Sequence, residues 1–170
     1  MKTILMRHCV VGLILGFATA VSSCGSDTTA PGGGNNNTAC TITLSGAATG
    51  SPACSDQTAT WTSGDNVSVI GASSIGGAST LSATVTISGE PTTQTYNLST
   101  GAHAFISVES GGARWHADGQ SLGSWSLVIT SVSPGPSSSS VKTYHLHGTL
   151  TATLEALSDN TSQVNLTVTF

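Results

Sequence analysis

Two histidines separated by one residue, His145 and His147, come nearest to the spacing of a metal site. Side chains at positions i and i+2 of a strand project from the same face, as two ligands of one zinc ion must. This face also carries Thr143, Thr149 and Thr151, and it is opposite the apolar residues of the same run. We therefore expect both histidines to be exposed polar residues, and a metal-dependent hydrolase that uses them is an alternative.

A second polar group lies in the run RWHAD at 114–118. Arg114, His116 and Asp118 share one face of a predicted strand, where a local ion pair and hydrogen bonds would account for them. If this strand were paired with residues 141–148, two pairs of side chains could converge on one metal ion. We expect no such site and no cofactor. The four candidate ligands, should the pairing occur, are His116, Asp118, His145 and His147.

No pattern typical of nucleophilic or acid–base catalysis stands out, and we expect no catalytic residues. Serine is frequent, but no serine lies in a G-x-S-x-G motif, and the acidic residues are scattered rather than paired. Lys and Arg together number only 4, which excludes nucleic acid binding by counterion replacement. A non-enzymatic binding or structural module is favoured. A small-ligand-binding β-barrel is the alternative, and it would need an interior cavity.

The N-terminus has the organisation of an export signal. Lys2 and Arg7 precede the apolar run VVGLILGFATAV at 10–21, which is shorter than the roughly 20 residues of a membrane-spanning helix. The run ends in the sequence VSSC at 21–24 instead of an A-x-A cleavage site. This sequence resembles the lipobox of bacterial lipoproteins.

The resemblance to lipoproteins implies where the chain is held. Residues 1–23 would be a cleaved signal peptide, and Cys24 would carry the lipid, through its thiol and its acylated amino group. Gly25 replaces the aspartate that retains enterobacterial lipoproteins at the inner membrane, so the outer membrane is favoured in a Gram-negative organism. Residues 24–39, rich in Gly, Asn and Thr, are expected to be a disordered tether. Residues 40–170 are expected to form a single domain, with a protein or glycan partner of unknown identity.

Two cysteines remain once Cys9 is cleaved off with the signal and Cys24 is acylated. Cys40 and Cys54 would then lie in an export compartment, where disulfides persist, so we expect them to be bonded to each other. The intervening sequence supplies no histidine or further thiol for a metal site.

The domain itself consists of short runs with alternating apolar and polar residues, separated by turn residues, as antiparallel strands have. The fold class expected is an all-β antiparallel sandwich or up-and-down barrel of about ten strands, with little or no helix. The run at 141–154 is long, and we expect it to bend at Gly148 and to serve two sheets. Strands are expected near 40–45, 57–62, 66–70, 80–88, 93–99, 103–109, 112–117, 124–132, 141–154 and 163–170. The core stripe expected is Leu81, Val85, Ile87, Leu146, Leu150, Val164, Leu166 and Val168.

Three late runs, GSWSLVITS, YHLHGTLTATL and SQVNLTVTF, together resemble the C-terminal half of uncharacterised β-sandwich domains of bacterial envelope lipoproteins. The resemblance implies the fold and no activity. Trp61, Trp115 and Trp125 alternate with small or apolar neighbours. We therefore expect them to pack in the core and not to form an exposed sugar-stacking surface.

Overall fold

The structure is a computed structural model that describes residues 40–74, 77–158 and 161–170. The predicted signal peptide, Cys24 and the predicted tether all lie in residues 1–39, outside the described residues. Within the described part of the chain, no helix is long and apolar enough to cross a membrane.

The described domain is all-β and antiparallel, which confirms the predicted fold class. The described ranges contain ten strands, close to the predicted ranges, and one 3₁₀ turn, η1 (Leu98–Thr100). The strands are β1 (Thr41–Gly46), β2 (Asp56–Thr62), β3 (Val67–Ser74), β4 (Ser79–Ser88), β5 (Thr95–Tyr96), β6 (His103–Ser110), β7 (Ala113–Ala117), β8 (Ser124–Ser137), β9 (Val141–Ala156) and β10 (Gln163–Thr169).

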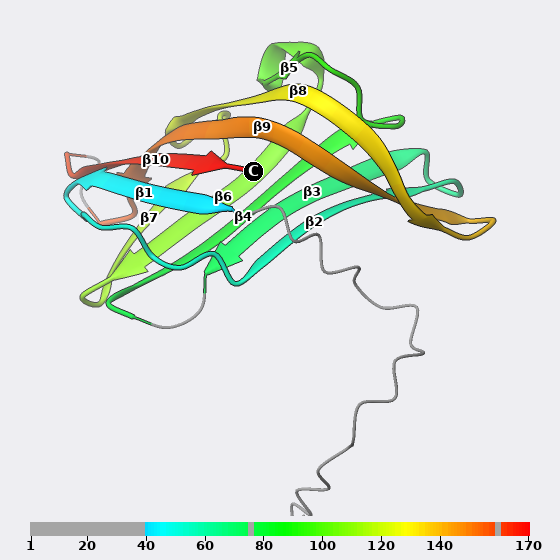
Figure 1. The fold of residues 1–170 in the computed structure, drawn as a ribbon. Coiled ribbons are helices and arrows are strands. Elements are labelled where there is room, and N and C mark those ends of the chain that lie inside the picture. Colours follow the sequence, from blue (N-terminus) through cyan, green and yellow to red (C-terminus); the bar gives the residue numbers. More distant parts are fainter. Residues whose placement is uncertain (1–39, 75–76, 159–160) are drawn as a thin grey trace, which may run out of the picture. The chain divides into compact units, whose positions relative to one another are not determined.

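The strands form two layers that share one long strand (Figure 1). Layer I has the order β5–β8–β9–β10–β1, and layer II has the order β2–β3–β4–β6–β7. The start of β9 pairs with β2 through residues 141–143, and its end pairs with β7 through Glu155 and Ala156. The hydrogen-bonded circuit therefore closes on itself through β9. The strands form a single ten-stranded sheet, so β9 connects the two layers of one sheet, and the prediction that this run serves two separate sheets was wrong.

Gly148 lies where β9 changes its partners. On one edge, β9 pairs with β2 before this glycine and with β10 after it. On the other edge, Gly148 is opposite Ile129 and His147 is opposite Ser131, so Thr130 of β8 is an extra residue in a bulge. A Cβ atom on Gly148 would lie 2.3 Å from the carbonyl oxygen of Val128. Only glycine lets the two backbones approach this closely.

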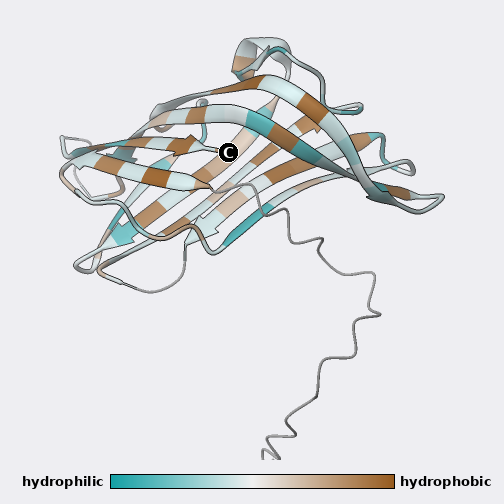
Figure 2. Cartoon of the chain, in the orientation of Figure 1, coloured by the Kyte–Doolittle hydropathy of each residue, from teal (hydrophilic) through white to brown (hydrophobic). Residues whose placement is uncertain are grey.

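Alternating side chains fill the space between the layers with apolar groups. Figure 2 shows this alternation as hydrophobic bands crossing the strands. All eight residues of the predicted core stripe are buried, with at most 3% of their surface exposed. Trp115 and Trp125 are buried as predicted, and their indole N–H groups donate to Ser162 and to the carbonyl oxygen of Asp118. Trp61 is only partly buried, so the prediction of core packing holds less fully there.

A disulfide joins Cys40 and Cys54, as the sequence predicted, with their Cα atoms 5.6 Å apart. The loop that it closes folds back on β1, where Leu44 and Gly50 exchange two backbone hydrogen bonds of 2.8 and 3.1 Å. The loop thereby covers part of the outer edge of β1. An uncovered strand edge is a site of unwanted pairing with other chains.

Three strands differ clearly in length from the prediction. Strand β3 (Val67–Ser74) continues four residues past the predicted end at 70. The strand predicted at 93–99 shortens to β5, because the Asn97 side chain accepts hydrogen bonds from the backbone N–H groups of Ser99 and Thr100 and starts η1. Strand β8 continues past the predicted residue 132 to Ser137. It includes Pro134 and Pro136, which an edge strand tolerates because one row of its N–H groups needs no partner.

Candidate binding surface

The four candidate metal ligands lie in separate parts of the domain. His145 and His147 of β9 are opposite residues of β8. His116 of β7 is opposite Glu155, eight residues beyond His147 on β9, which corresponds to roughly 26 Å of extended strand. The pairing of residues 112–117 with 141–148 that would have gathered them does not occur. Among the described residues, no group of three or more His, Cys, Asp or Glu side chains is placed to hold a metal ion.

Arg114 and Asp118 also have different partners from the shared strand face that the sequence suggested. The Nε atom of Arg114 lies 2.9 Å from a carboxylate oxygen of Glu109, in an exposed ion pair. Asp118 instead lies beyond the end of β7 and caps the turn at 120–122. The Asp118 carboxylate accepts hydrogen bonds from backbone N–H groups of this turn. These bonds, that from Leu122 most strongly, hold the pKa of the Asp118 carboxyl well below its usual range. Its role is to fix the turn between β7 and β8.

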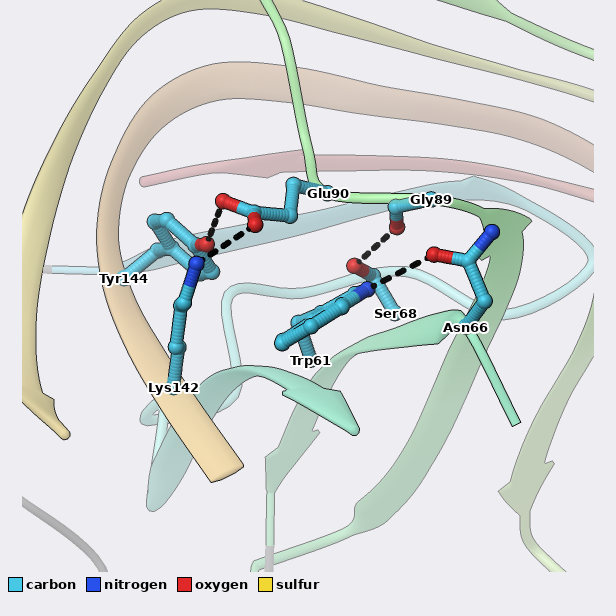
Figure 3. Close-up of polar contacts among 7 residues, drawn as sticks. All are labelled: Trp61, Asn66, Ser68, Gly89, Glu90, Lys142 and Tyr144. Atoms are coloured by element: carbon cyan, nitrogen blue, oxygen red, sulfur yellow. Dashed lines mark hydrogen bonds and ion pairs between the residues drawn. The ribbon is translucent and has the colours of Figure 1, made fainter. Parts of the chain in front are cut away.

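A polar cluster at the seam between β2 and β9 was not predicted (Figure 3). The carboxylate of Glu90, in the turn after β4, accepts a hydrogen bond from the Tyr144 hydroxyl and forms an ion pair of 2.6 Å with Lys142 Nζ. The same ammonium group lies 4.7 Å from the ring centroid of Trp61, in a cation–π contact. The Trp61 indole N–H donates to the side-chain oxygen of Asn66 at 3.3 Å. Four segments of the chain therefore meet at this cluster.

The electrostatics of this cluster favour a structural role over catalysis. Hydrogen bonds from Lys142 and then from Tyr144 lower the pKa of Glu90. Burial, followed by the contact with Glu90, raises the pKa of Tyr144 to about 12. A general acid or base works best with a pKa near the operating pH, and both groups are shifted away from neutrality. We conclude that the cluster clamps the turn after β4 onto β9.

The outward face of layer II is mostly composed of serine and threonine side chains, and the register aligns them in rows across the strands. One row runs through Ser73, Ser82, Ser107 and His116. The next row runs through Gly71, Thr84 and Phe105. We refer to these seven residues as the platform.

Two large apolar side chains are exposed on this polar face, Val69 of β3 and Phe105 of β6, and Phe105 is the aromatic one. It is 58% exposed although it lies within β6, and its strand neighbours Ala104 and Ile106 point the other way, toward the core. Burial of a phenylalanine side chain stabilises a protein by roughly 1.5–3 kcal/mol, and this residue forgoes most of that gain. Its ring centroid lies 5.5 Å from that of His116, in an edge-on arrangement with an interplanar angle of 61°. The histidine therefore supports one side of an otherwise uncovered ring.

His116 contributes a second unusual feature to the platform. Its Nε2 atom is buried and has no hydrogen-bond partner among the described residues. A buried polar atom left without a partner costs roughly 1–3 kcal/mol, so such atoms are uncommon in folded proteins. The atom belongs to a side chain that lines an open hollow. A group that enters the hollow could offset this cost only after the imidazole turns, because the atom itself is closed off from solvent.

Two hollows lie next to each other on the platform. One has a volume of about 410 Å³ and includes His116, Ser107 and the Arg114–Glu109 ion pair in its lining. The other has a volume of about 150 Å³ and lies over Gly71 and Thr84. Ser73 and Ser82 line both. We refer to these two adjacent hollows together as the groove. Phe105 lines neither hollow and lies beside them, through its cross-strand partner Thr84 and its ring contact with His116.

A small-ligand carrier would need its cavity between the layers, where the structure places apolar side chains. The buried apolar cluster draws residues from both layers, such as Ile106 and Val85 of layer II and Leu127 and Leu166 of layer I. The groove on the platform is on the outside of the domain and is open to solvent. The geometry therefore favours a surface that binds a partner over an interior that carries a ligand.

Neither the exposure of Phe105 nor the Glu90 cluster was predicted from the sequence. A signal for Phe105 is present in HAFISVES at 103–110, where the apolar alternation runs through Ala104, Ile106 and Val108 and the aromatic residue is out of step with it. No comparable signal marks Glu90, because its partners on β9 lie more than fifty residues away.

Comparison with known proteins does not extend this picture: no protein-family model, curated protein or solved structure matches the chain. No relative therefore suggests an activity or a ligand. Functional inference rests on the residues of this chain.

Proposed function

We propose that the protein is a lipid-anchored cell-envelope β domain that acts as a non-enzymatic binding module. The anchor is Cys24, at the end of the sequence VSSC at 21–24, which follows a basic start and a short apolar run. Gly25 favours the outer membrane in a Gram-negative cell. The tether predicted at 24–39 would let the β domain reach beyond the lipid headgroups.

The observation that carries the binding part of the proposal is the exposed ring of Phe105 beside an open groove. A domain that only coats a surface gains nothing from an uncovered aromatic side chain in the middle of a strand. A single exposed apolar residue is ordinary on a protein surface, so the proposal rests on Phe105 together with the concave, hydroxyl-lined groove beside it. The proposed partner is a molecule other than membrane lipid, because attachment to the membrane is already assigned to the lipid on Cys24.

Enzymatic action is not proposed, for reasons of geometry. The histidines that suggested a hydrolase lie apart, and the Glu90 cluster has pKa shifts that lead away from acid–base chemistry at neutral pH.

The anchor is tested by substitution of the cysteine in a Gram-negative host. Wild-type protein should incorporate labelled palmitate and remain with membranes after a carbonate wash. Cys24→Ser should lose both properties. The matched control is Cys9→Ser, which changes a cysteine inside the proposed signal and should behave like wild type. Palmitate labelling and membrane association that persist in Cys24→Ser would overturn the proposed anchor.

A further inference from the structure

We propose that the platform on layer II binds neutral polysaccharide, with one sugar ring stacked on Phe105 and a sugar hydroxyl bonded to His116. The inference deepens the proposed function, because it names the chemical class of the partner. It rests on three separate features of the platform: an uncovered aromatic ring, an unsatisfied imidazole nitrogen and a groove with hydroxyl walls.

The aromatic ring supplies the stacking surface. Phe105 presents 58% of its surface to solvent, and its cross-strand neighbour Thr84 is followed in the same row by Gly71, which has no side chain. The smaller hollow lies over Gly71, beyond Thr84 in the same row and next to the Thr58 hydroxyl. The face of an aromatic ring is electron-rich and attracts the C–H hydrogens that line one side of a sugar ring. A flat, partly apolar ligand suits this position.

The imidazole supplies a polar contact next to the ring. His116 lies against Phe105, and its Nε2 atom lacks a hydrogen-bond partner among the described residues. That atom is closed off from solvent, but the side chain lines the larger hollow. A turn of the imidazole about its Cβ–Cγ bond would present the nitrogen to a hydroxyl that enters the hollow. A sugar stacked on Phe105 would carry such a hydroxyl at its rim.

The walls and charges of the groove favour a neutral ligand. Serine and threonine hydroxyls dominate its lining and can donate to or accept from sugar hydroxyls. The cation in the lining, Arg114, is paired with Glu109, and Asp56 adds a negative charge at the other end. An acidic polysaccharide would meet no unpaired cation among these lining residues. From β3 to β7 the groove crosses three strand spacings, roughly 14 Å, which is enough for more than one sugar unit.

The test measures retention of the full-length lipidated protein on immobilised glycans, in a detergent without a sugar headgroup. The probes are neutral polysaccharides (β-glucan, mannan and xylan) and acidic ones (alginate and heparin). Wild-type protein should bind at least one neutral polysaccharide, and the free oligosaccharide should compete. Phe105→Ala should weaken this binding on the order of tenfold, with an unchanged melting temperature.

Two further variants separate binding from folding. His116→Phe keeps an aromatic ring and removes the nitrogen, so binding should weaken several-fold while the melting temperature stays the same or rises. Val128→Ala is the matched control, because Val128 is an exposed apolar residue on a strand of layer I and should bind like wild type.

Several results would overturn the inference: no neutral glycan retained, retention only on acidic glycans, or equal loss in Phe105→Ala and Val128→Ala. Membrane association of Phe105→Ala should equal that of wild type. If wild-type protein is anchored to membranes but binds no glycan, only this inference is overturned. If the protein stays on membranes without Cys24, the proposed function is contradicted instead.

Discussion

The carboxylate of Glu90 accepts a hydrogen bond from the hydroxyl of Tyr144, fifty-four residues further along the chain. Tyr144 is 6% exposed, and its loss of water together with the nearby negative charge raises its pKa to about 12. The contact ties the turn after β4 to the strand that closes the circuit of strands. Its strength should therefore be visible in the pH dependence of unfolding.

We predict that the domain loses stability between about pH 10 and pH 12. An unfolded tyrosine has a pKa near 10, so the unfolded chain releases this proton before the folded one does. A raised pKa thus stabilises the fold below about pH 10, and this stabilisation is lost as the pH rises toward 12. The loss attributable to Tyr144 should be roughly 2–3 kcal/mol in the free energy of unfolding, measured with urea at each pH.

The matched variants are the two tyrosine substitutions, since the chain has only 2 tyrosines. Tyr144→Phe should lack this part of the alkaline loss, and Tyr96→Phe should keep it. Absorbance titration of Tyr96→Phe reports Tyr144 alone. A Tyr144 pKa close to 10 in that variant would contradict the role assigned to the Glu90 contact.

We predict that Gly148→Ala destabilises the domain by about 1–3 kcal/mol. The added Cβ would lie 2.3 Å from the carbonyl oxygen of Val128 and 3.2 Å from the Cα atom of Ile129, so the backbones of β8 and β9 must separate. Gly64→Ala is the control, because a Cβ atom there meets nothing within 4 Å. Urea unfolding of the two variants gives the comparison, and equal midpoints would show that the close approach at the bulge is unimportant.

We predict that Gln57→Met stabilises the domain by about 1–3 kcal/mol. Gln57 is 8% exposed, and its Oε1 atom is buried without a hydrogen-bond partner among the described residues. Methionine has a similar length and no such oxygen to desolvate. Gln163→Met, on the exposed side of β10, should change the free energy of unfolding by less than about 0.5 kcal/mol. A loss of stability in Gln57→Met would mean that the glutamine side chain has a structural partner.

We predict that removal of the disulfide costs roughly 3 kcal/mol and leaves the strands intact. Cys40 and Cys54 close a loop with a sequence separation of 14, and a cross-link over such a loop acts mainly on the unfolded chain. Cys54→Ala and reduced wild type should show the same lowered urea midpoint, with the circular dichroism of an all-β protein. A change in the spectrum would show instead that the loop is needed for the folded sheet.

Much of this fold follows from alternation in the sequence. Leu81, Val85 and Ile87 point inward in β4 because successive side chains of a strand face opposite ways, and a single sequence already contains that pattern. The two roles of β9 also follow from its length and from Gly148. Local signals misled at the ends of elements, as where Asn97 starts a 3₁₀ turn within a run that alternates like a strand, and at Trp61, which is only partly buried.

The platform was beyond the reach of the sequence for a different reason. Phe105 and His116 come together because β6 pairs with β7 in one particular register, and a shift by one residue would place either ring on the opposite face. The same holds for Lys142 over Trp61, which depends on the pairing of β2 with β9. Pairing between distant strands is a property of the whole chain, and no short motif encodes it.

The closure through β9 has a consequence for biogenesis. Strands β2 and β7 pair early with their neighbours β3 and β6. The second partner of β2 is available only when residues 141–143 have been made, about eighty residues later, and that of β7 only with residues 155 and 156. Contacts so distant in sequence form slowly, because a long loop must close before they contribute. On the proposed export route, this delay would keep the chain in a form that can be threaded across the inner membrane. A chain that stops before residue 141 would leave β2 and β7 as two open edges, a form suited to pairing with other chains and to capture by quality-control proteases.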